Sequence, residues 1–282
     1  MAGDGYAKPV LVTTEWLAGH LGDKGLVVAE VDENPDLYDE GHIPGAIKLH
    51  WREDLEDPVE RDLVDKQAFE QLMGRSGISN DTTVVLYGDR NNWFAAYAYW
   101  YLKIYGHGDV RILDGGRQKW IDENRELSTD VPTVQAAGYT AEDRDESIRI
   151  YRDEVRASIG GAGELVDVRS PQEFSGELVS PPGYEQEGAQ RAGHIPTAKS
   201  IPWAQAVRDD GTFKPAQELR ELYGANGVTP DKSVVAYCRI GERSAHTWFV
   251  LRELLGYGDV KNYDGSWTEW GNLVDVPIEK GS

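Results

Sequence analysis

The chain has 282 residues, of which 40% are apolar and 28% are charged, and its formal net charge at pH 7 is -20. A chain of this length is predicted to form two domains, because single cores of that size are uncommon. The acidic excess argues against nucleic-acid binding, which depends on Lys and Arg neutralising phosphates. No apolar stretch approaches the roughly 20 residues of a membrane helix, and the start has no signal-peptide pattern. We therefore expect a cytoplasmic protein that binds small molecules and no membrane.

The first half alternates short apolar runs with helical patterns. Strands are predicted at residues 26–31, 82–87 and 110–113, and helices at residues 66–75 and 92–105. Near-continuous apolar strands separated by helices are typical of a parallel sheet that is covered on both faces.

The second half repeats this order. Strands are predicted at residues 165–168, 233–237 and 260–263, and helices at residues 215–223 and 244–255. We therefore predict the α/β class, with two tandem domains that are each a mainly parallel sheet with helices on both faces.

Sequence motifs recur in the two halves at a nearly constant offset. Residues 87–90 align with residues 237–240 (237 − 87 = 150), and Gly-His-Ile-Pro occurs at residues 41–44 and again at 193–196. Only two copies exist and their period is long, so paired domains are favoured over a repeat array. We place the domains at residues 1–127 and 148–282, with residues 128–147 as the linker. The histidine of each Gly-His-Ile-Pro turn is expected to be structural, because both halves contain it.

The only cysteine, Cys238, stands between a predicted strand and a predicted helix and opens the loop Cys-Arg-Ile-Gly-Glu-Arg-Ser. In α/β proteins, ligands bind where strands end and helices begin, and backbone N–H groups in such turns form a nest for anions. Arg239 and Arg243 add positive charge, so a reactive thiolate is predicted. Glu242 is expected to point outward or to pair with an arginine. A buried, inert thiol is the commoner fate of a lone cysteine, but these cations weigh against it.

The spacing of the loop distinguishes between several kinds of thiol chemistry. A phosphatase loop of the form Cys-x5-Arg would need arginine at Ser244, whereas Arg243 comes one residue too early. A thiol protease needs a histidine base, and the spacing of His246 fits no protease pattern. A smaller ring of N–H groups suits a sulfur anion. The residues therefore favour a ping-pong sulfur transfer in which Cys238 holds a sulfane sulfur as a persulfide.

The paired halves, the two Gly-His-Ile-Pro segments, the loop at 238–244 and the segment at 263–270 resemble tandem-domain rhodaneses, the thiosulfate sulfurtransferases, over nearly the whole chain. The resemblance is closest to actinobacterial forms with the same loop. It implies that Cys238 carries the persulfide, with thiosulfate as donor, cyanide or a thiol as acceptor, and neither cofactor nor metal. The substrate-binding residues it implies are Arg243, Arg239, Ile240, Gly241, Glu242 and Ser244.

Two departures from the vertebrate rhodaneses concern the donor. Ile240 stands where those enzymes have lysine, and Glu173 stands where they have an arginine after the Asp-x-Arg segment. The related mercaptopyruvate enzymes have Cys-Gly-Ser-Gly in the loop, so Arg239 favours thiosulfate, whose two charges suit two cations. A 3-mercaptopyruvate sulfurtransferase and a persulfide carrier that serves a protein partner remain the alternatives.

The first half provides an internal control. Gly88 and Asp89 stand at the positions of Cys238 and Arg239, so this half is expected to be a non-catalytic, structural domain. In the second half, Arg169 is a candidate for steering the donor, although an ion pair fits it better.

Two further features of the second half have open interpretations. Trp203 is a candidate pocket residue, although a core tryptophan is the ordinary reading of it. Residues 174–192 make this half 15 residues longer between the strand end and the Gly-His-Ile-Pro turn (193 − 168 = 25 against 41 − 31 = 10). That insertion is either a functional loop or a tolerated surface insertion.

Overall fold

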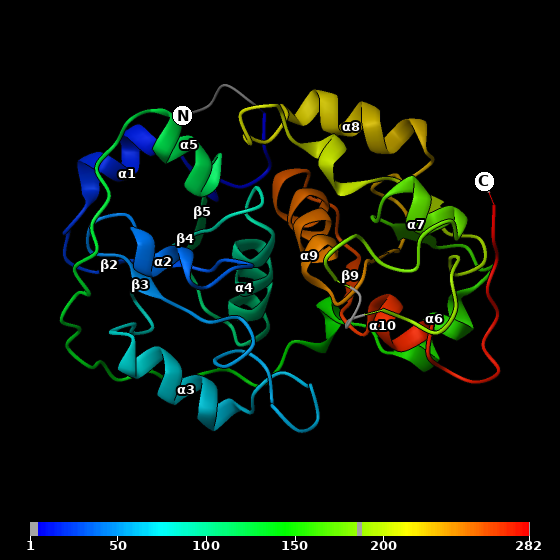
Figure 1. Cartoon of the computed structure of the whole chain (residues 1–282), viewed down its shortest axis with the longest axis horizontal. Coiled ribbons are helices and arrows are strands. Elements are labelled where there is room, and N and C mark those ends of the chain that lie inside the picture. The colour runs from blue at the N-terminus through cyan, green and yellow to red at the C-terminus, as the bar shows by residue number, and fades with distance from the viewer. Residues whose placement is uncertain (1–4, 185–187, 282) are drawn as a thin grey trace. The chain divides into compact units, whose positions relative to one another are not determined.

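The computed structural model describes residues 5–184 and 188–281, and the chain divides into two compact units (Figure 1). The N-terminal unit comprises Pro9–Asp145 and Arg208–Phe213. The C-terminal unit comprises Met1–Lys8, Glu146–Val207 and Lys214–Ser282. Each unit has its own sheet, and no helix within the described ranges is long and apolar enough to cross a membrane.

The N-terminal unit contains a five-stranded sheet in which all neighbouring strands are parallel. The strand order is β1 (Leu11–Val12), β5 (Val110–Leu113), β4 (Thr83–Tyr87), β2 (Leu26–Glu30) and β3 (Ile47–Lys48). The helices are α1 (Thr14–His20), α2 (Leu37–Glu40), α3 (Lys66–Arg75), α4 (Trp93–Ile104) and α5 (Gly116–Asp122).

The C-terminal unit contains a four-stranded parallel sheet. Its order is β7 (Lys199–Ser200), β6 (Glu164–Asp167), β8 (Val234–Tyr237) and β9 (Val260–Tyr263). The described helices are α6 (Arg152–Ser158), α7 (Pro171–Ser175), α8 (Ala216–Ala225), α9 (Glu242–Trp248) and α10 (Ser266–Trp270), with the 3₁₀ turns η1 (Glu146–Ile148) and η3 (Trp203–Ala206) and the π-helical segment η4 (Phe249–Leu254).

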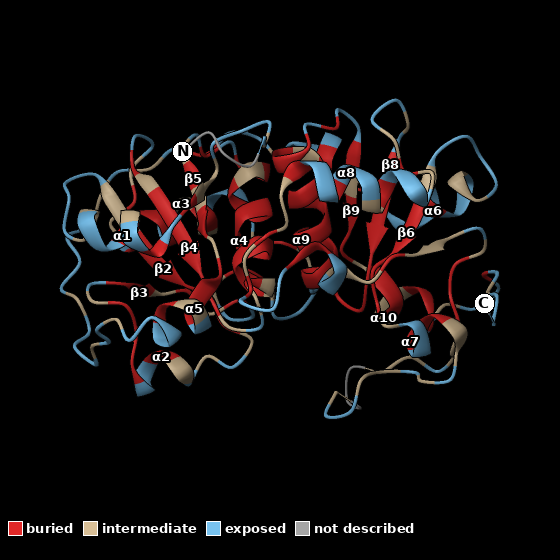
Figure 2. Cartoon of the chain, turned by 90° about the horizontal axis from the view of Figure 1, so that it is seen from above, coloured by how far each residue is buried: buried red, intermediate tan, exposed pale blue. Residues whose placement is uncertain are grey.

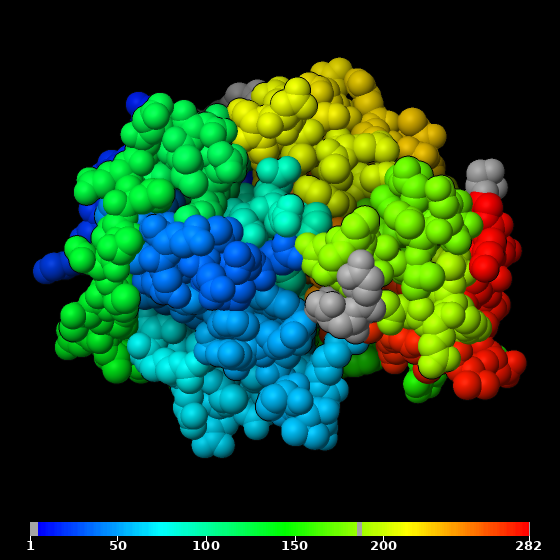
Figure 3. Space-filling view, viewed as in Figure 1, coloured from blue at the N-terminus to red at the C-terminus, as the bar shows by residue number. Residues whose placement is uncertain are grey.

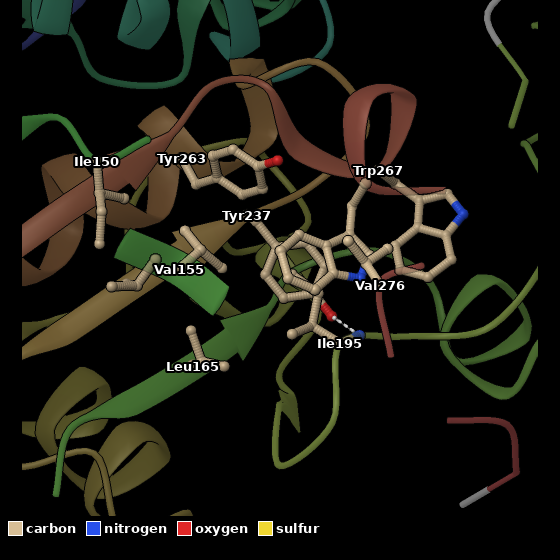
Figure 4. Packing of buried hydrophobic residues seen from close by; sticks show 10 residues of the cluster. Ile150, Val155, Leu165, Ile195, Tyr237, Tyr263, Trp267 and Val276 are labelled. Atoms are coloured by element: carbon tan, nitrogen blue, oxygen red, sulfur yellow. Dashed lines mark hydrogen bonds between the residues drawn. The ribbon is translucent and has the colours of Figure 1, made fainter. Parts of the chain in front are cut away.

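Helices cover both faces of each sheet, as the apolar strands predict. In the C-terminal unit, Tyr237 of β8 faces a core that also contains Val155 of α6 and Trp267 of α10 (Figure 4). The other face of β8 and β9 contacts α9, which is buried along its whole length (Figure 2). The N-terminal unit has the same arrangement, with α1 and α5 in one core and α4 against β4 and β5 on the other face. The predicted α/β class is therefore confirmed.

The recurring motifs have the same structural role in both units. The backbone N–H of Ile43 donates to the hydroxyl of Tyr87, and that of Ile195 donates to the hydroxyl of Tyr237 (Figure 4). The histidine of each Gly-His-Ile-Pro turn stacks on a preceding aromatic ring, with centroid distances of 3.9 Å and 3.6 Å. Its Nδ1 contacts the backbone oxygen of the same aromatic residue. The histidines hold the turn onto the preceding segment, as the repeat indicates.

The structure refines several predicted elements. The strands and helices predicted from apolar runs lie within two residues of the observed bounds, apart from the helix predicted at 244–255. That helix begins earlier, at Glu242, and continues after Trp248 as the π-helical segment η4. The residues predicted as linker run along the N-terminal unit as far as Asp145, whose N–H donates to the oxygen of Ile104. Of the insertion at 174–192, residues 185–187 lie outside the described residues.

Candidate active site

The loop from Cys238 to Gly241 connects β8 to α9 at the carboxyl end of the C-terminal sheet. Gly241 has a left-handed φ of 104°, and a Cβ there would lie 2.8 Å from the Cα of Asp264. A side chain at this position would be strained and would clash with Asp264, so the position requires glycine. Glycine allows the tight turn after which α9 begins at the next residue. The hydroxyl of Ser266 accepts the N–H of Cys238 at 3.0 Å, which fixes the start of the loop.

The sulfur atom of Cys238 lies inside this turn and is fully buried. The backbone N–H of Gly241 donates to Sγ at 3.2 Å, and the hydroxyl of Ser244 lies 3.5 Å from it. The thiol in turn donates to Oε2 of Glu242 at 3.2 Å. The predicted nest of N–H groups therefore has two acceptors. The N–H of Gly241 donates to the sulfur, and the N–H of Ile240 donates to the carboxylate of Glu242 at 3.3 Å.

Two buried carboxylates face the two arginines of the loop. Nη2 of Arg239 lies 3.3 Å from Oε1 of Glu242. The guanidinium of Arg243 forms a two-pronged pair with Glu173 at 3.0 and 3.1 Å, and its Nε lies 3.4 Å from Glu242. All four side chains are at most 6% exposed. Of the two expectations for Glu242, the structure shows pairing with arginine and not an outward orientation.

These contacts set the ionisation of the sulfur. Burial raises the pKa of the Cys238 thiol, and the charge of Glu242 raises it further, against lowering contributions from Arg243 and Ser244. Burial also opposes ionisation of Glu242, but Arg239 and Arg243 outweigh it and lower the pKa of that carboxyl. The proton therefore rests on sulfur and the charge on the carboxylate. Glu242 and Glu173 offset the charges of the two arginines on which the prediction of a reactive thiolate relied, so that reactivity stays a prediction.

Glu173 reaches the loop from the first turn of α7. Ser170 is the N-cap of this helix and Pro171 its first residue, and Glu173 and Ser170 cap each other reciprocally at 3.0 and 3.2 Å. This local motif fixes the position of the carboxylate that pairs with Arg243. The sequence shows the capping pattern, but nothing in it connects Glu173 to a residue 70 positions later.

Tyr184 is a second contact that the sequence did not reveal. Its ring lies 4.1 Å from the guanidinium carbon of Arg239, within cation–π range. Tyr184 belongs to the insertion at 174–192, and the segment around α7, light green in Figure 3, lies at the surface of its unit. The extra length of this half was the one available signal for the contact.

The two predicted pocket residues lie outside the sulfur's immediate contacts. Arg169 is buried, with Nη2 at 2.6 Å from Asp167 and 2.7 Å from the oxygen of Gly193, and its guanidinium packs over Trp267. These are the contacts of a structural ion pair. Trp203 is half-buried and meets the ring of His246 edge-on. Burial lowers the pKa of His246 to about 3, so this histidine is neutral at pH 7.

The corresponding loop of the N-terminal unit has a different backbone. A Cβ at Gly88 would lie 2.1 Å from the backbone oxygen of Val31. Arg90, Asn91 and Asn92 all have left-handed φ values, between 47° and 68°. This loop has no cysteine, and it has no space for a side chain at residue 88. Across residues 5–184 and 188–281, no group of His, Cys, Asp and Glu could hold a metal ion.

Comparisons with known proteins agree with this geometry. The family model described as "Rhodanese-like domain" matches residues 13–123 and 151–273. The chain is 62% identical to the "Sulfur carrier protein TtuD" of Thermus thermophilus, over 98% of this chain and 99% of the relative. It is 59% identical to a Saccharopolyspora erythraea protein provisionally named a thiosulfate sulfurtransferase, over 96% of both chains.

A solved structure is similar to this chain over most of its length. The structure of EanB carrying a cysteine persulfide, with ergothioneine, aligns with a TM-score of 0.83 at 26% identity. The alignment covers 97% of this chain and 71% of EanB.

Proposed function

The chain belongs to the rhodanese family of sulfurtransferases, and from that premise we propose that it transfers a sulfane sulfur from thiosulfate to cyanide or a thiol through a persulfide on Cys238. The observation that carries the proposal is the position of the only cysteine. Its sulfur receives the Gly241 N–H and lies beside the Ser244 hydroxyl, at the carboxyl end of the sheet.

The proposed reaction has two halves. Cys238 first loses its thiol proton to solvent, and its thiolate attacks the outer sulfur of thiosulfate; the sulfur–sulfur bond of the donor breaks, and sulfite leaves with the electron pair. The acceptor then attacks the outer sulfur of the persulfide, and Cys238 leaves as a thiolate. Gly241 and Ser244 favour both steps of the reaction, because their hydrogen bonds stabilise the sulfur anion of Cys238 whenever it forms.

A second candidate is a persulfide carrier that delivers sulfur to a protein partner. It is favoured by the 62% identity to the relative named a sulfur carrier protein. Both candidates use the same persulfide and differ in whether a small acceptor is turned over.

Mass spectrometry after incubation with thiosulfate tests the persulfide. We expect one added sulfur atom on Cys238 and none on a Cys238→Ser variant. An unmodified Cys238 after incubation would rule out both candidates. Steady-state turnover with cyanide then separates the enzyme from the carrier, and parallel assays with 3-mercaptopyruvate test the donor.

A further inference from the structure

Glu242 has the contacts that a bound anion would have. Its carboxylate accepts the Ile240 N–H at 3.3 Å and the Cys238 thiol at 3.2 Å, and lies 3.3 to 3.4 Å from Arg239 and Arg243. The residue is completely buried. A carboxylate held by a loop N–H and two guanidinium groups occupies the cradle in which an anionic donor would otherwise lie.

Among the described residues, the ion pairs beside the sulfur join two arginines to two carboxylates while Glu242 is in this position. Arg239 and Arg243 contribute two positive charges, and Glu242 and Glu173 contribute two negative ones. Asp264, beside Gly241, is itself paired with Arg149 at 2.8 Å. A dianion that approaches the sulfur therefore competes with a carboxylate that already contacts both arginines.

We propose that Glu242 is the specificity-determining residue of this site, an internal anion that fills the cradle of sulfur-free Cys238 and weakens the binding of dianionic donors. The inference rests on the proposed function for its donor. The effect of Glu242 on the ionisation of the Cys238 thiol does not depend on the identity of the donor. Burial and Glu242 together raise the pKa of Cys238, so the carboxylate that excludes the donor also keeps the sulfur protonated.

Glu242→Gln keeps the shape of the side chain and removes its charge. We expect the thiolate of this variant to form at a pH lower by about one unit or more, because the nearest negative charge is gone. The KM for thiosulfate should fall about tenfold or more, since the two arginines then face one carboxylate. The KM for 3-mercaptopyruvate, which carries one negative charge, should fall less.

The thiol measurement needs no donor and has a simple blank. Because Cys238 is the only cysteine, the thiolate absorbance of the protein minus that of Cys238→Ser reports this sulfur alone. Glu253→Gln is the matched control, because Glu253 is also buried and ion-paired, to Lys8, but is not among the contacts of the sulfur. This control should leave the titration of Cys238 unchanged.

The outcomes separate the inference from the proposed function. An unchanged thiolate titration in folded Glu242→Gln, or an unchanged or higher KM for thiosulfate, would overturn the inference. If the variant does not fold, the wild-type titration decides: a thiolate that forms below the ordinary thiol value of about 8.5 would contradict it. If no persulfide forms at all, the proposed function fails, while the titration still tests the role of Glu242.

Discussion

Asp32 of the N-terminal unit stands where Arg169 stands in the C-terminal unit. Each lies two residues after a buried carboxylate at the end of a strand. That carboxylate is Glu30 in the N-terminal unit and Asp167 in the C-terminal unit. Both carboxylates pair with an arginine, but Glu30 pairs with Arg117 of α5 and Asp167 with Arg169 itself. The same ion pair is thus built from different elements, and Asp32 is left as an additional buried acid beside Glu30.

We expect this arrangement to make the stability of the N-terminal unit depend on pH. Burial, and then the charge of Glu30, raise the pKa of Asp32 to about 8. In the unfolded chain it is about 3.9. The folded state therefore holds the proton more tightly, so the contribution of Asp32 to stability falls as pH rises from about 4 to about 8.

Asp32→Asn should remove this loss. At pH 8.5 we expect the free energy of unfolding of the N-terminal unit to rise by several kcal/mol, up to about 5 kcal/mol, because no carboxylate is then buried beside Glu30. At pH 5 the gain should be smaller. Urea unfolding at the two pH values measures the difference, with Asp36→Asn as the control at an exposed position of the same unit. An equal effect at both pH values would contradict the assignment.

At the scale of elements, the loops after β4 and β8 align in sequence but differ in backbone conformation. The loop of the C-terminal unit turns on one left-handed residue, Gly241, whereas its counterpart uses three consecutive non-glycine residues in that region. Gly88, aligned with Cys238, packs against the backbone oxygen of Val31. Replacing one side chain in the first half therefore cannot reproduce the backbone of the Cys238 loop there.

Gly88→Ala tests this packing. The new Cβ would meet a backbone atom at 2.1 Å, which cannot move aside as a flexible side chain would. We expect a loss of about 1 to 3 kcal/mol in the free energy of unfolding of the N-terminal unit. Gly19→Ala is the control: it lies within α1, where a Cβ meets nothing within 4 Å, and should stabilise by about 0.5 to 1 kcal/mol. Equal stability of the Gly88 variant and the wild type would show that the loop adapts.

Some elements could not be predicted from their own residues. β1, β3 and β7 have two residues each, too few for any periodicity, and they are strands only because a neighbouring strand binds them. The apolar pattern of residues 244–255 predicts a helix but carries no information on hydrogen-bond spacing, so the change to a π-helix at Phe249 was missed.

At the scale of the whole molecule, the two units exchange short segments of chain. Residues near the N-terminus belong to the C-terminal unit: the N–H of Ala7 donates to the oxygen of Leu254, and Lys8 pairs with Glu253 at 2.8 Å. Residues 208–213 belong to the N-terminal unit, where the N–H of Phe213 donates to Asp114. Domain bounds that are predicted as continuous ranges of residues cannot include such exchanged segments.

Deletion of residues 1–8 should therefore lower the free energy of unfolding of the C-terminal unit. We expect a loss of about 1 to 2 kcal/mol, small because Lys8 is half-exposed and its ion pair is partly screened. Hydrogen exchange should accelerate around η4 and stay unchanged in β2 and β4. Lys8→Met, which removes only the charge, should give part of the effect. Faster exchange in the N-terminal unit instead would contradict the division.

The α/β class and the tandem organisation follow from the sequence alone, because apolar runs and a 150-residue repeat can be read along the chain, and the same is true of the choice of Cys238 as the candidate nucleophile. The charge state of the site does not. It depends on Glu242 turning inward and on Glu173 reaching Arg243 from 70 residues away. Electrostatic interaction depends on distance in space and on burial, so only the tertiary structure shows that two carboxylates pair with the arginines and that burial and Glu242 raise the pKa of the Cys238 thiol.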